Sequence, residues 1–195
     1  MLRVAITGNI ASGKSVVGSI LTSKGYSVFD TDEIAHGVLA TSYKVRDAFK
    51  NFDITNYKGE ISREKLGKLV FTRPDLKKTL EEIVHPEIRD ELNKIFEYNL
   101  EKDFVFIGIP LLFEAHFEDM FDKSILVMTD DEIRLKRLMK RNNLSKENAQ
   151  LRIDSQMPQE EKVKKVDYVI KNNTSLKNVE IEIEKVLNQL LNNKD

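Results

Sequence analysis

The sequence predicts a three-layer α/β fold with a central parallel sheet, on two observations. Short apolar runs recur along the chain, and segments with the 3.6-residue period of helices lie between them. The run at residues 104–109 is unbroken, which is typical of a strand that is covered on both faces. Strands that alternate with helices build a parallel sheet between two helical layers.

The expected strands are residues 4–7, 26–29, 104–109, 124–128 and 168–170. A helix follows Lys14 and is closed by Gly25, so the chain starts with a βαβ unit. Residues 33–100 show helical stretches broken by Gly59, Pro74 and Pro86. Residues 131–165 form a charged helical segment, and an amphipathic helix ends the chain, with residues 192–195 expected to fray.

A chain of 195 residues is too short for two ordinary independent domains, so residues 1–195 are expected to form one domain. Its nucleotide-binding core takes residues 1–32, 101–130 and 166–195. The helical insertion takes residues 33–100, and a helical lid takes residues 131–165. Each boundary is approximate, because it is read from changes of pattern alone.

Composition excludes several classes of function. Lysine plus arginine (31) balances aspartate plus glutamate (32), so no overall field favours nucleic acid or an anionic membrane. Cysteine is absent, which excludes disulfides and thiol chemistry, and the three histidines lack the spacing of a zinc site. The first residues run directly into a strand, and no apolar run is long enough for a membrane helix. A cytoplasmic protein is expected.

The segment Gly8–Asn9–Ile10–Ala11–Ser12–Gly13–Lys14–Ser15 satisfies the pattern G-x-x-x-x-G-K-[ST] between a strand and a helix. Such a phosphate loop, or P-loop, directs backbone amides and a helix N-terminus at an anion. Lys14 is expected to reach the β- and γ-phosphates of ATP, and the Ser15 hydroxyl to bind Mg²⁺. The alternative is a strand-to-helix turn that merely uses glycine, but it leaves the Lys-Ser pair unexplained.

Asp30 and Asp32 follow the second strand, at the same sheet edge as the phosphate loop. We assign the catalytic base to Asp32 and a metal-binding role to Asp30, because the third strand ends in Pro110 instead of a carboxylate. The alternative is that both aspartates cap a helix that begins near Glu33.

Arg134, Arg137 and Arg141 share one face of the predicted lid helix, and Arg152 and Gln156 repeat an i, i+4 pair in the next helix. A lid with aligned guanidiniums is suited to closing on a triphosphate, and Arg137 and Arg141 are the favoured residues. The alternative is a solvated basic face.

Two weaker signals remain. Pro86 is expected in the first turn of a helix, with His85 just before it and facing a groove, although a structural histidine is the favoured alternative. Phe113, Phe117 and Phe121 recur at helical spacing and are expected in the core.

These motifs, in this order, resemble the dephospho-coenzyme A kinase family. The resemblance covers the whole chain and adds to the phosphate loop and the D-x-D pair four further matches: His85–Pro86–Glu87–Ile88, Pro110–Leu111–Leu112–Phe113–Glu114, the lid spacings R-x-x-x-R and R-x-x-x-Q, and Asp167 through Asn172. It departs at Asn9, Ala11 and Thr174, where the family usually has glycine.

The resemblance implies that ATP phosphorylates the ribose 3′-hydroxyl of dephospho-CoA, with Mg²⁺ as cofactor. The ATP-binding residues would be Gly8, Ala11, Ser12, Gly13, Lys14, Ser15, Val16, Arg141 and Asn172. The acceptor-binding residues would be Asp32, His85, Leu111, Glu114, Arg152 and Gln156. A monomer or weak homo-oligomer is expected. The alternatives are a kinase for a nucleoside, nucleotide or sugar acid, and a nucleotide-dependent switch.

Overall fold

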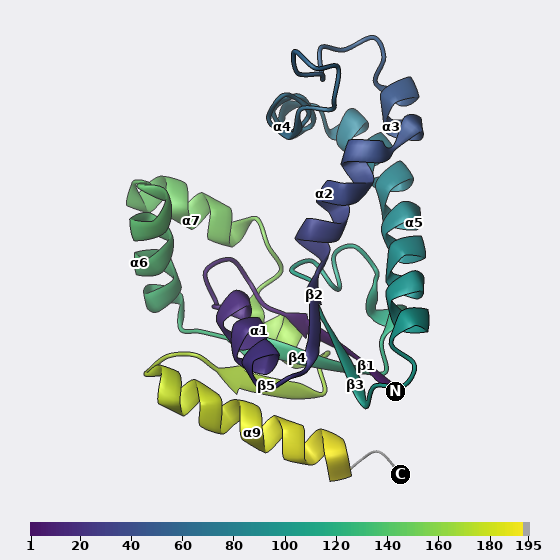
Figure 1. Cartoon of the computed structure of the whole chain (residues 1–195). Coiled ribbons are helices and arrows are strands. Elements are labelled where there is room, and N and C mark those ends of the chain that lie inside the picture. Colours follow the sequence, from purple (N-terminus) through teal and green to yellow (C-terminus); the bar gives the residue numbers. More distant parts are fainter. Residues whose placement is uncertain (193–195) are drawn as a thin grey trace. The chain divides into compact units, whose positions relative to one another are not determined.

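The computed structural model describes residues 1–192 and divides into two compact units (Figure 1). The core unit contains Met1–Asp30 and the chain from Asn99 onward, and the helical unit contains Thr31–Tyr98. Residues 193–195, on which the expected fraying of the C-terminus partly falls, lie outside the described residues.

The core unit is built on a parallel sheet, in which the described strands follow the order β2-β3-β1-β4-β5. The bounds are Leu2–Thr7 for β1, Ser27–Asp30 for β2, Phe104–Gly108 for β3, Lys123–Met128 for β4 and Tyr168–Lys171 for β5. Strand β1 lies in the middle and pairs with β3 and β4. The residues that follow β1, β2 and β4 therefore emerge at one carboxyl edge.

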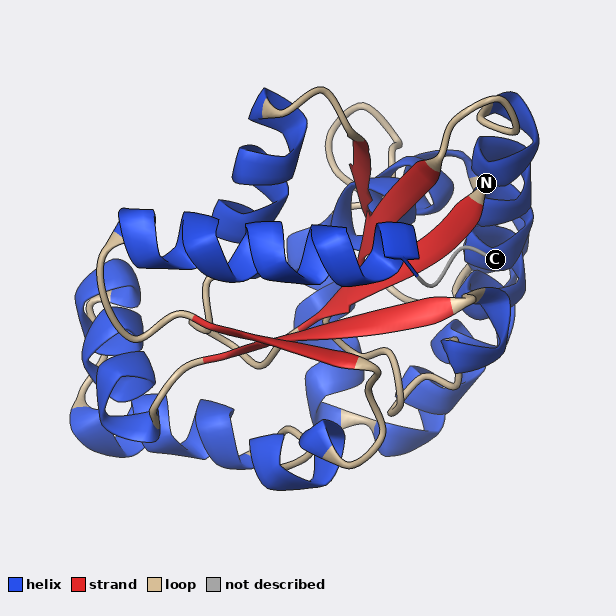
Figure 2. Ribbon diagram, turned by 90° about the horizontal axis from the view of Figure 1, so that it is seen from below, coloured by secondary structure: helices blue, strands red, loops and turns tan. Residues whose placement is uncertain are grey.

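Helices α1 (Lys14–Ser23) and α9 (Leu176–Asn192) share a hydrophobic core with the sheet. Seen from below, α9 runs across the strands (Figure 2). Val4 and Ile6 of β1 contribute to this core. Ala5, between them, is also fully buried, so both faces of the sheet are covered. The three-layer α/β fold predicted from the alternating pattern is confirmed.

The remaining helices of the core unit come after β4. They are α6 (Asp131–Asn142), α7 (Lys146–Asp154) and α8 (Gln159–Val163). Helices α6 and α7 contact one another around Leu138, Ala149 and Ile153, and Ile10 and Ala11 pack against this small core. The phosphate loop is therefore in direct contact with the segment that was predicted to form a lid.

The helical unit consists of α2 (Thr31–Thr41), α3 (Tyr43–Ala48), α4 (Arg63–Thr72) and α5 (Pro74–Tyr98) among the residues described. Helix α5 contacts each of the other three. Apolar side chains from these helices, such as Val45, Leu66 and Leu92, are fully buried and give the unit its own core. An isolated antiparallel bridge joins Thr55 to Ile61.

One local prediction was wrong. Pro86 lies inside α5, which begins twelve residues earlier at Pro74, because the apolar stripe Val84, Ile88 and Leu92 continues the buried face through the proline. Helix α2 begins at Thr31, two residues before Glu33, which agrees with the helix start expected near Glu33.

The phenylalanines around 113–121 do not lie on a regular helix. The segment after β3 forms turns and a short 3-10 helix, Glu118–Met120. Phe113 and Phe117 are nevertheless buried, as predicted, so their spacing reflects packing of turns into the core.

Candidate active site

The phosphate loop joins the end of β1 to the start of α1, as its sequence context predicted. Gly13 stands at the N-cap position of α1 with φ 93°, and no side chain caps this helix terminus. Ala11 also has a left-handed backbone, with φ 62°. An uncapped helix N-terminus behind a loop with left-handed residues is a binding site for an anion such as phosphate.

Gly13 is required by a close approach as well as by its backbone angle. A Cβ atom at this position would lie 2.0 Å from Nδ2 of Asn172, which is a clash that neither residue relieves without moving. The side-chain amide of Asn172 donates a hydrogen bond of 2.8 Å from Nδ2 to the carbonyl oxygen of Ser12, and Asn172 is buried. Asn172, predicted to bind ATP, therefore also holds the loop itself.

Thr129 holds the same part of the loop, and Arg137 holds Asn172. The Thr129 hydroxyl, just after β4, donates a hydrogen bond of 2.8 Å to the Ser12 carbonyl oxygen. Nη2 of Arg137 donates to the Asn172 carbonyl oxygen at 3.1 Å. Sequence reasoning missed Thr129, because its role depends on the contact between the β4 end and a loop 117 positions away.

Lys14 and Asp30 form an ion pair at the carboxyl edge of the sheet, with 2.6 Å between Nζ and Oδ2. The Lys14 side chain is 14% exposed and that of Asp30 is 35% exposed, so both remain accessible to a ligand. Gly108, at the end of β3, leaves room for the pair: a Cβ there would lie 2.8 Å from Lys14 Nζ and 3.1 Å from Asp30 Oδ2. The structure thus brings together Lys14, which the sequence assigned to phosphate binding, and Asp30, which it assigned to metal binding.

The site suits a magnesium ion. Ser15 is exposed in the first turn of α1, and Asp30 presents a partly exposed carboxylate. Residues 1–192 hold no group of three or more His, Cys, Asp or Glu side chains able to bind a metal by themselves. Mg²⁺ does not need such a group, because it is commonly held by one or two protein oxygens together with substrate phosphates and water.

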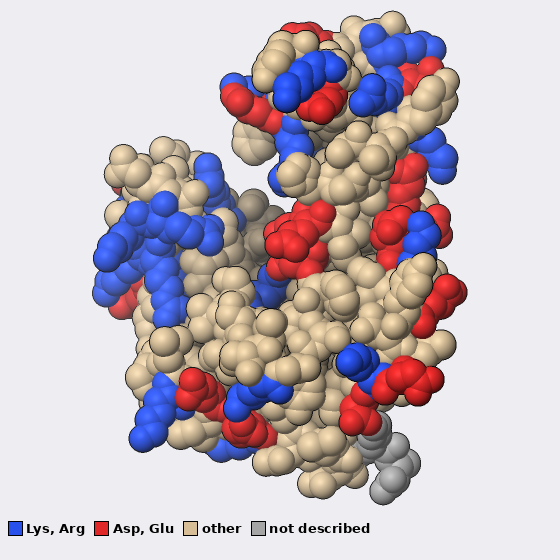
Figure 3. Space-filling view, in the orientation of Figure 1, with Lys and Arg blue, Asp and Glu red and all other residues tan. Residues whose placement is uncertain are grey.

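The three arginines of α6 have different environments, which corrects the expectation of an aligned row. Arg134 is 2% exposed and bonded inside the protein, to Asp131 and to the loop. Arg137 is half-buried, and Arg141 is exposed with its Nε on Asn142. Lysines and arginines gather on the surface of α6 (Figure 3), where Lys136, Lys140 and Arg141 are exposed.

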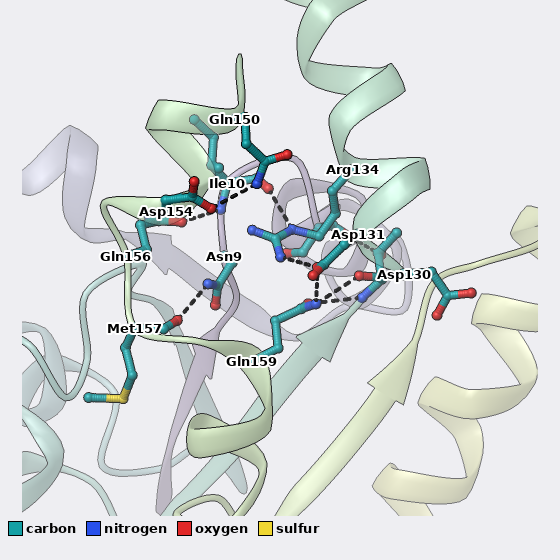
Figure 4. Close-up of polar contacts among 12 residues, drawn as sticks. Asn9, Ile10, Asp130, Asp131, Arg134, Gln150, Asp154, Gln156, Met157 and Gln159 are labelled. Atoms are coloured by element: carbon teal, nitrogen blue, oxygen red, sulfur yellow. Dashed lines mark hydrogen bonds and ion pairs between the residues drawn. The ribbon is translucent and has the colours of Figure 1, made fainter. Parts of the chain in front are cut away.

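The segment after α7 contacts the loop through polar groups (Figure 4). Oε1 of Gln156 accepts a hydrogen bond of 2.7 Å from the Ile10 amide, and Nδ2 of Asn9 donates to the Met157 carbonyl oxygen at 2.8 Å. Arg152, predicted to pair with Gln156 on the acceptor, is exposed in α7. Asn9 therefore has a structural role of its own, because it holds the phosphate loop against the segment after α7.

Leu111 and Glu114 lie in the turn segment after β3. Leu111 is 44% exposed. Glu114 Oε1 lies 2.9 Å from Nζ of Lys162, a fully buried residue of α8. Glu114 also accepts a hydrogen bond from the Met157 amide at 3.3 Å. Sequence reasoning missed Lys162, since one lysine in a charged helix carries no signal of burial.

Asp32 and His85 belong to the helical unit. Asp32 is the second residue of α2 and is exposed, two positions after Asp30 in the chain. His85 is half-buried in the middle of α5. An acidic residue in the first turn is favourable to the helix dipole, and this function does not prevent the carboxylate from binding a substrate hydroxyl.

The parallel sheet, the phosphate loop and the Lys14–Asp30 pair define a class, the P-loop kinases. Shikimate kinase from Acinetobacter baumannii shares the fold, with a TM-score of 0.58 at 17% identity over 100% of this chain and 95% of that one. The chain belongs to the dephospho-CoA kinase family, whose model, described as dephospho-CoA kinase, matches residues 2–178.

Relatives agree over nearly the full length. The dephospho-CoA kinase of Oceanobacillus iheyensis is 41% identical over 192 residues, covering 95% of this chain and 96% of the relative. That of Listeria innocua is 39% identical, with 98% of each covered. The solved dephospho-CoA kinase of Campylobacter jejuni has a TM-score of 0.75 and 34% identity, with 96% of each chain covered. A solved Thermus thermophilus protein reaches 0.84 at 38% identity, with 97% of each covered.

Proposed function

We propose that this enzyme transfers the γ-phosphoryl group of ATP to the ribose 3′-hydroxyl of dephospho-CoA, with the residues named below in these roles. Membership of the family makes the protein a kinase that uses ATP to phosphorylate dephospho-CoA in coenzyme A biosynthesis. The observation that carries the assignment of roles is the pair Lys14–Asp30 beside the phosphate loop.

The nucleotide is held by the loop and the start of α1. Loop amides such as those of Gly13, Lys14 and Ser15 would face the phosphates, with Lys14 on the β- and γ-phosphates. Gly8, Ala11, Ser12, Val16, Asn172 and Arg141 complete the proposed ATP site. Lys14 would exchange its contact with Asp30 for a contact with the triphosphate. Ser15 and Asp30 are the residues that would hold Mg²⁺, which when bound would neutralise charge on the phosphates.

The transfer step needs a base and charge stabilisation. Asp32 accepts the proton of the ribose 3′-hydroxyl. At the same time, the oxygen of this hydroxyl forms a bond to the γ-phosphorus. The bond between that phosphorus and the β–γ bridging oxygen breaks, and ADP leaves with the bond's electron pair. Arg137 and Arg141 stabilise the negative charge of the transferred group. A carboxylate, and not its amide, is required because only the carboxylate accepts the proton.

The acceptor site is assigned to His85, Leu111, Glu114, Arg152 and Gln156, together with Asp32. The Glu114–Lys162 pair supports this assignment in part, because a buried lysine fixes the carboxylate that would meet the acceptor. We place the enzyme in the cytoplasm as a monomer or weak homo-oligomer, acting on a small molecule and not on nucleic acid. No helix within the described part of the chain has the length and hydropathy to cross a membrane.

A direct assay tests the activity. The protein is incubated with Mg²⁺, ATP and dephospho-CoA, and ADP and CoA are measured together by chromatography. We expect equal amounts of the two products, and no ADP above background without acceptor. Shikimate, gluconate and adenosine serve as competing acceptors. Turnover on one of these without CoA formation would show that the substrate assignment is wrong.

Substitution of Asp32 tests the base. Asp32→Asn is expected to lower kcat by about 10²- to 10⁴-fold, which is the usual contribution of general base catalysis, while the Kd for ATP changes less than about twofold. Glu33→Gln is the matched control: it removes the same charge from the same exposed helical turn and should keep full activity. Equal loss in both variants would assign the effect to the helix terminus.

A further inference from the structure

Arg134 makes two directed contacts from a buried position in α6. Its Nε donates a hydrogen bond of 3.2 Å to the Ile10 carbonyl oxygen, and its Nη1 lies 2.6 Å from Oδ1 of Asp131 (Figure 4). The side chain is 2% exposed. Burying a guanidinium costs free energy unless its N–H groups are bonded, and Nη2 of Arg134 has no hydrogen-bond partner among the described residues. The arrangement is therefore costly for the fold and calls for a functional reason.

A second residue orients this ion pair. Nε2 of Gln159 in α8 donates to the same Asp131 oxygen at 3.0 Å and to the Thr129 carbonyl oxygen at 2.9 Å. The Thr129 amide donates back to Oε1 of Gln159 at 3.2 Å. The carboxylate that holds Arg134 is therefore itself held, and the guanidinium has little freedom to turn away from Ile10.

The bond to Ile10 sets the direction of the next amide. A trans peptide group is planar, so the N–H of Ala11 points opposite to the Ile10 carbonyl that Arg134 holds. The Ile10 amide is held in turn by Gln156. Ala11 has φ 62°, a left-handed angle that alanine adopts at a disadvantage of about tenfold, and the loop therefore needs outside contacts to keep this shape.

We propose that Arg134 is a positioning residue, which presets the phosphate loop in its anion-binding shape and so determines the affinity for the ATP triphosphate. It acts through the Ile10–Ala11 peptide and does not itself touch the nucleotide. The proposal rests on the proposed role of the loop in binding ATP. The proposal also explains how alanine is tolerated at position 11. The bond from Arg134 holds the left-handed backbone angle that a glycine would adopt without this contact.

The test compares ATP affinities by calorimetry and steady-state kinetics. Arg134→Gln is expected to raise the Kd and KM for ATP about tenfold, with the KM for dephospho-CoA within about twofold. Lys136→Gln, on the same helix and exposed, removes the same charge and should leave all values unchanged. Arg134→Lys, which keeps the charge but not both bonds, replaces Arg134→Gln if the latter does not fold.

A rescue experiment separates positioning from general destabilisation. Ala11→Gly in the Arg134→Gln background is expected to recover at least half of the lost affinity on a logarithmic scale, because glycine adopts the left-handed angle freely. The same change is made in the parent protein, and the recovery is counted relative to the Kd of that Ala11→Gly variant. A thermal unfolding curve on each variant records any loss of stability, which the glycine is not expected to restore.

Two outcomes would overturn the proposal: a Kd for Arg134→Gln no higher than that for Lys136→Gln, or no recovery with Ala11→Gly. Failure of the proposed function gives a different result, because the parent protein itself would then neither bind nor turn over ATP. A parent protein that is active, with variants that bind ATP equally well, rejects only the role of Arg134.

Discussion

Some residues of the candidate site can be predicted from sequence motifs, whereas others have roles that depend only on their neighbours in the folded structure. Lys14 and Asp30 are 16 positions apart and meet at 2.6 Å because β1 and β2 end at the same sheet edge. Gly108 is the third member of this arrangement, and it carries no chemistry. Its contribution is the missing Cβ, which sequence inspection cannot recognise without the neighbouring strand.

Gly108→Ala tests this arrangement at the residue scale. The new methyl group would lie 2.8 Å from Lys14 Nζ, so the lysine must move while the backbone keeps its place. We expect a change of less than about 1 kcal/mol in the free energy of unfolding, together with a roughly tenfold higher Kd for ATP. Calorimetry and urea unfolding measure the two effects.

Gly67→Ala is the control for Gly108→Ala. Gly67 is exposed in α4, and a Cβ there meets no atom within 4 Å. This change should stabilise the helix by about 0.5–1 kcal/mol and leave ATP binding unchanged. An unchanged Kd in Gly108→Ala as well would show that the room beside Lys14 has no function.

At the scale of the element, α5 shows how tertiary packing overrides a local signal. Its 25 residues include Pro86, which cannot donate a hydrogen bond to the carbonyl of residue 82. The helix continues because the buried stripe Val84, Ile88 and Leu92 runs through the proline. The proline is exposed, so packing does not account for its presence. A residue that lowers helix stability at an exposed position indicates a functional constraint.

Pro86→Ala is accordingly expected to stabilise the protein by about 1–2 kcal/mol, since alanine restores the hydrogen bond and proline costs about 3 kcal/mol in an ideal helix interior. The KM for dephospho-CoA should rise if His85 and its neighbour shape the acceptor site. Urea unfolding and kinetics measure the two effects. Asp90→Ala, one turn further on the exposed side, controls for the general gain from alanine. A loss of stability in Pro86→Ala alone would contradict the argument.

At the scale of the whole molecule, charged contacts tie the strand beginnings of the core unit. Arg3 binds Asp122, which precedes β4, through Nη2 at 2.6 Å and Nε at 3.1 Å, and its backbone amide adds a bond of 2.8 Å. Asp167, which precedes β5, accepts bonds of 2.8 Å from the Ser124 amide and hydroxyl. The phosphate loop lies at the opposite, carboxyl edge of the sheet.

The Arg3–Asp122 contact predicts a dependence of stability on pH. The side-chain hydrogen bond from Arg3 lowers the pKa of Asp122 below its ordinary value. A carboxylate with a lowered folded-state pKa stabilises the fold above its unfolded pKa of about 3.9, and this stabilisation is lost as the pH falls through the folded value. Asp122→Asn should therefore cost about 1 kcal/mol at pH 7, discounted for partial exposure, and progressively less below pH 4.

Urea unfolding of the parent protein and Asp122→Asn between pH 3 and 7 measures this difference. Asp47→Asn, which breaks an exposed pair with Lys50, is the control and should cost little at any pH. A difference between the parent protein and Asp122→Asn that stays constant down to pH 3 would contradict the assignment, because it would not come from the ionised form of Asp122.

The sequence by itself determined the order of strands and helices, the phosphate loop and its expected ligand. These features follow from local rules, since apolar runs, glycines and a Lys-Ser pair keep their meaning wherever the chain folds. It also indicated the family, through motifs in a fixed order.

Only the tertiary structure decided which of these residues bind one another. Arg134 looked like a partner of Arg137 and Arg141 and is instead buried on the loop, and Lys162 and Gly108 gave no sign of their roles. The physical reason is that burial and hydrogen bonding depend on neighbours that are distant in the chain. An arginine or lysine in the sequence looks the same whether it is solvated on a helix surface or buried in an ion pair. Helical periodicity places an arginine on a face, but packing decides what that face meets.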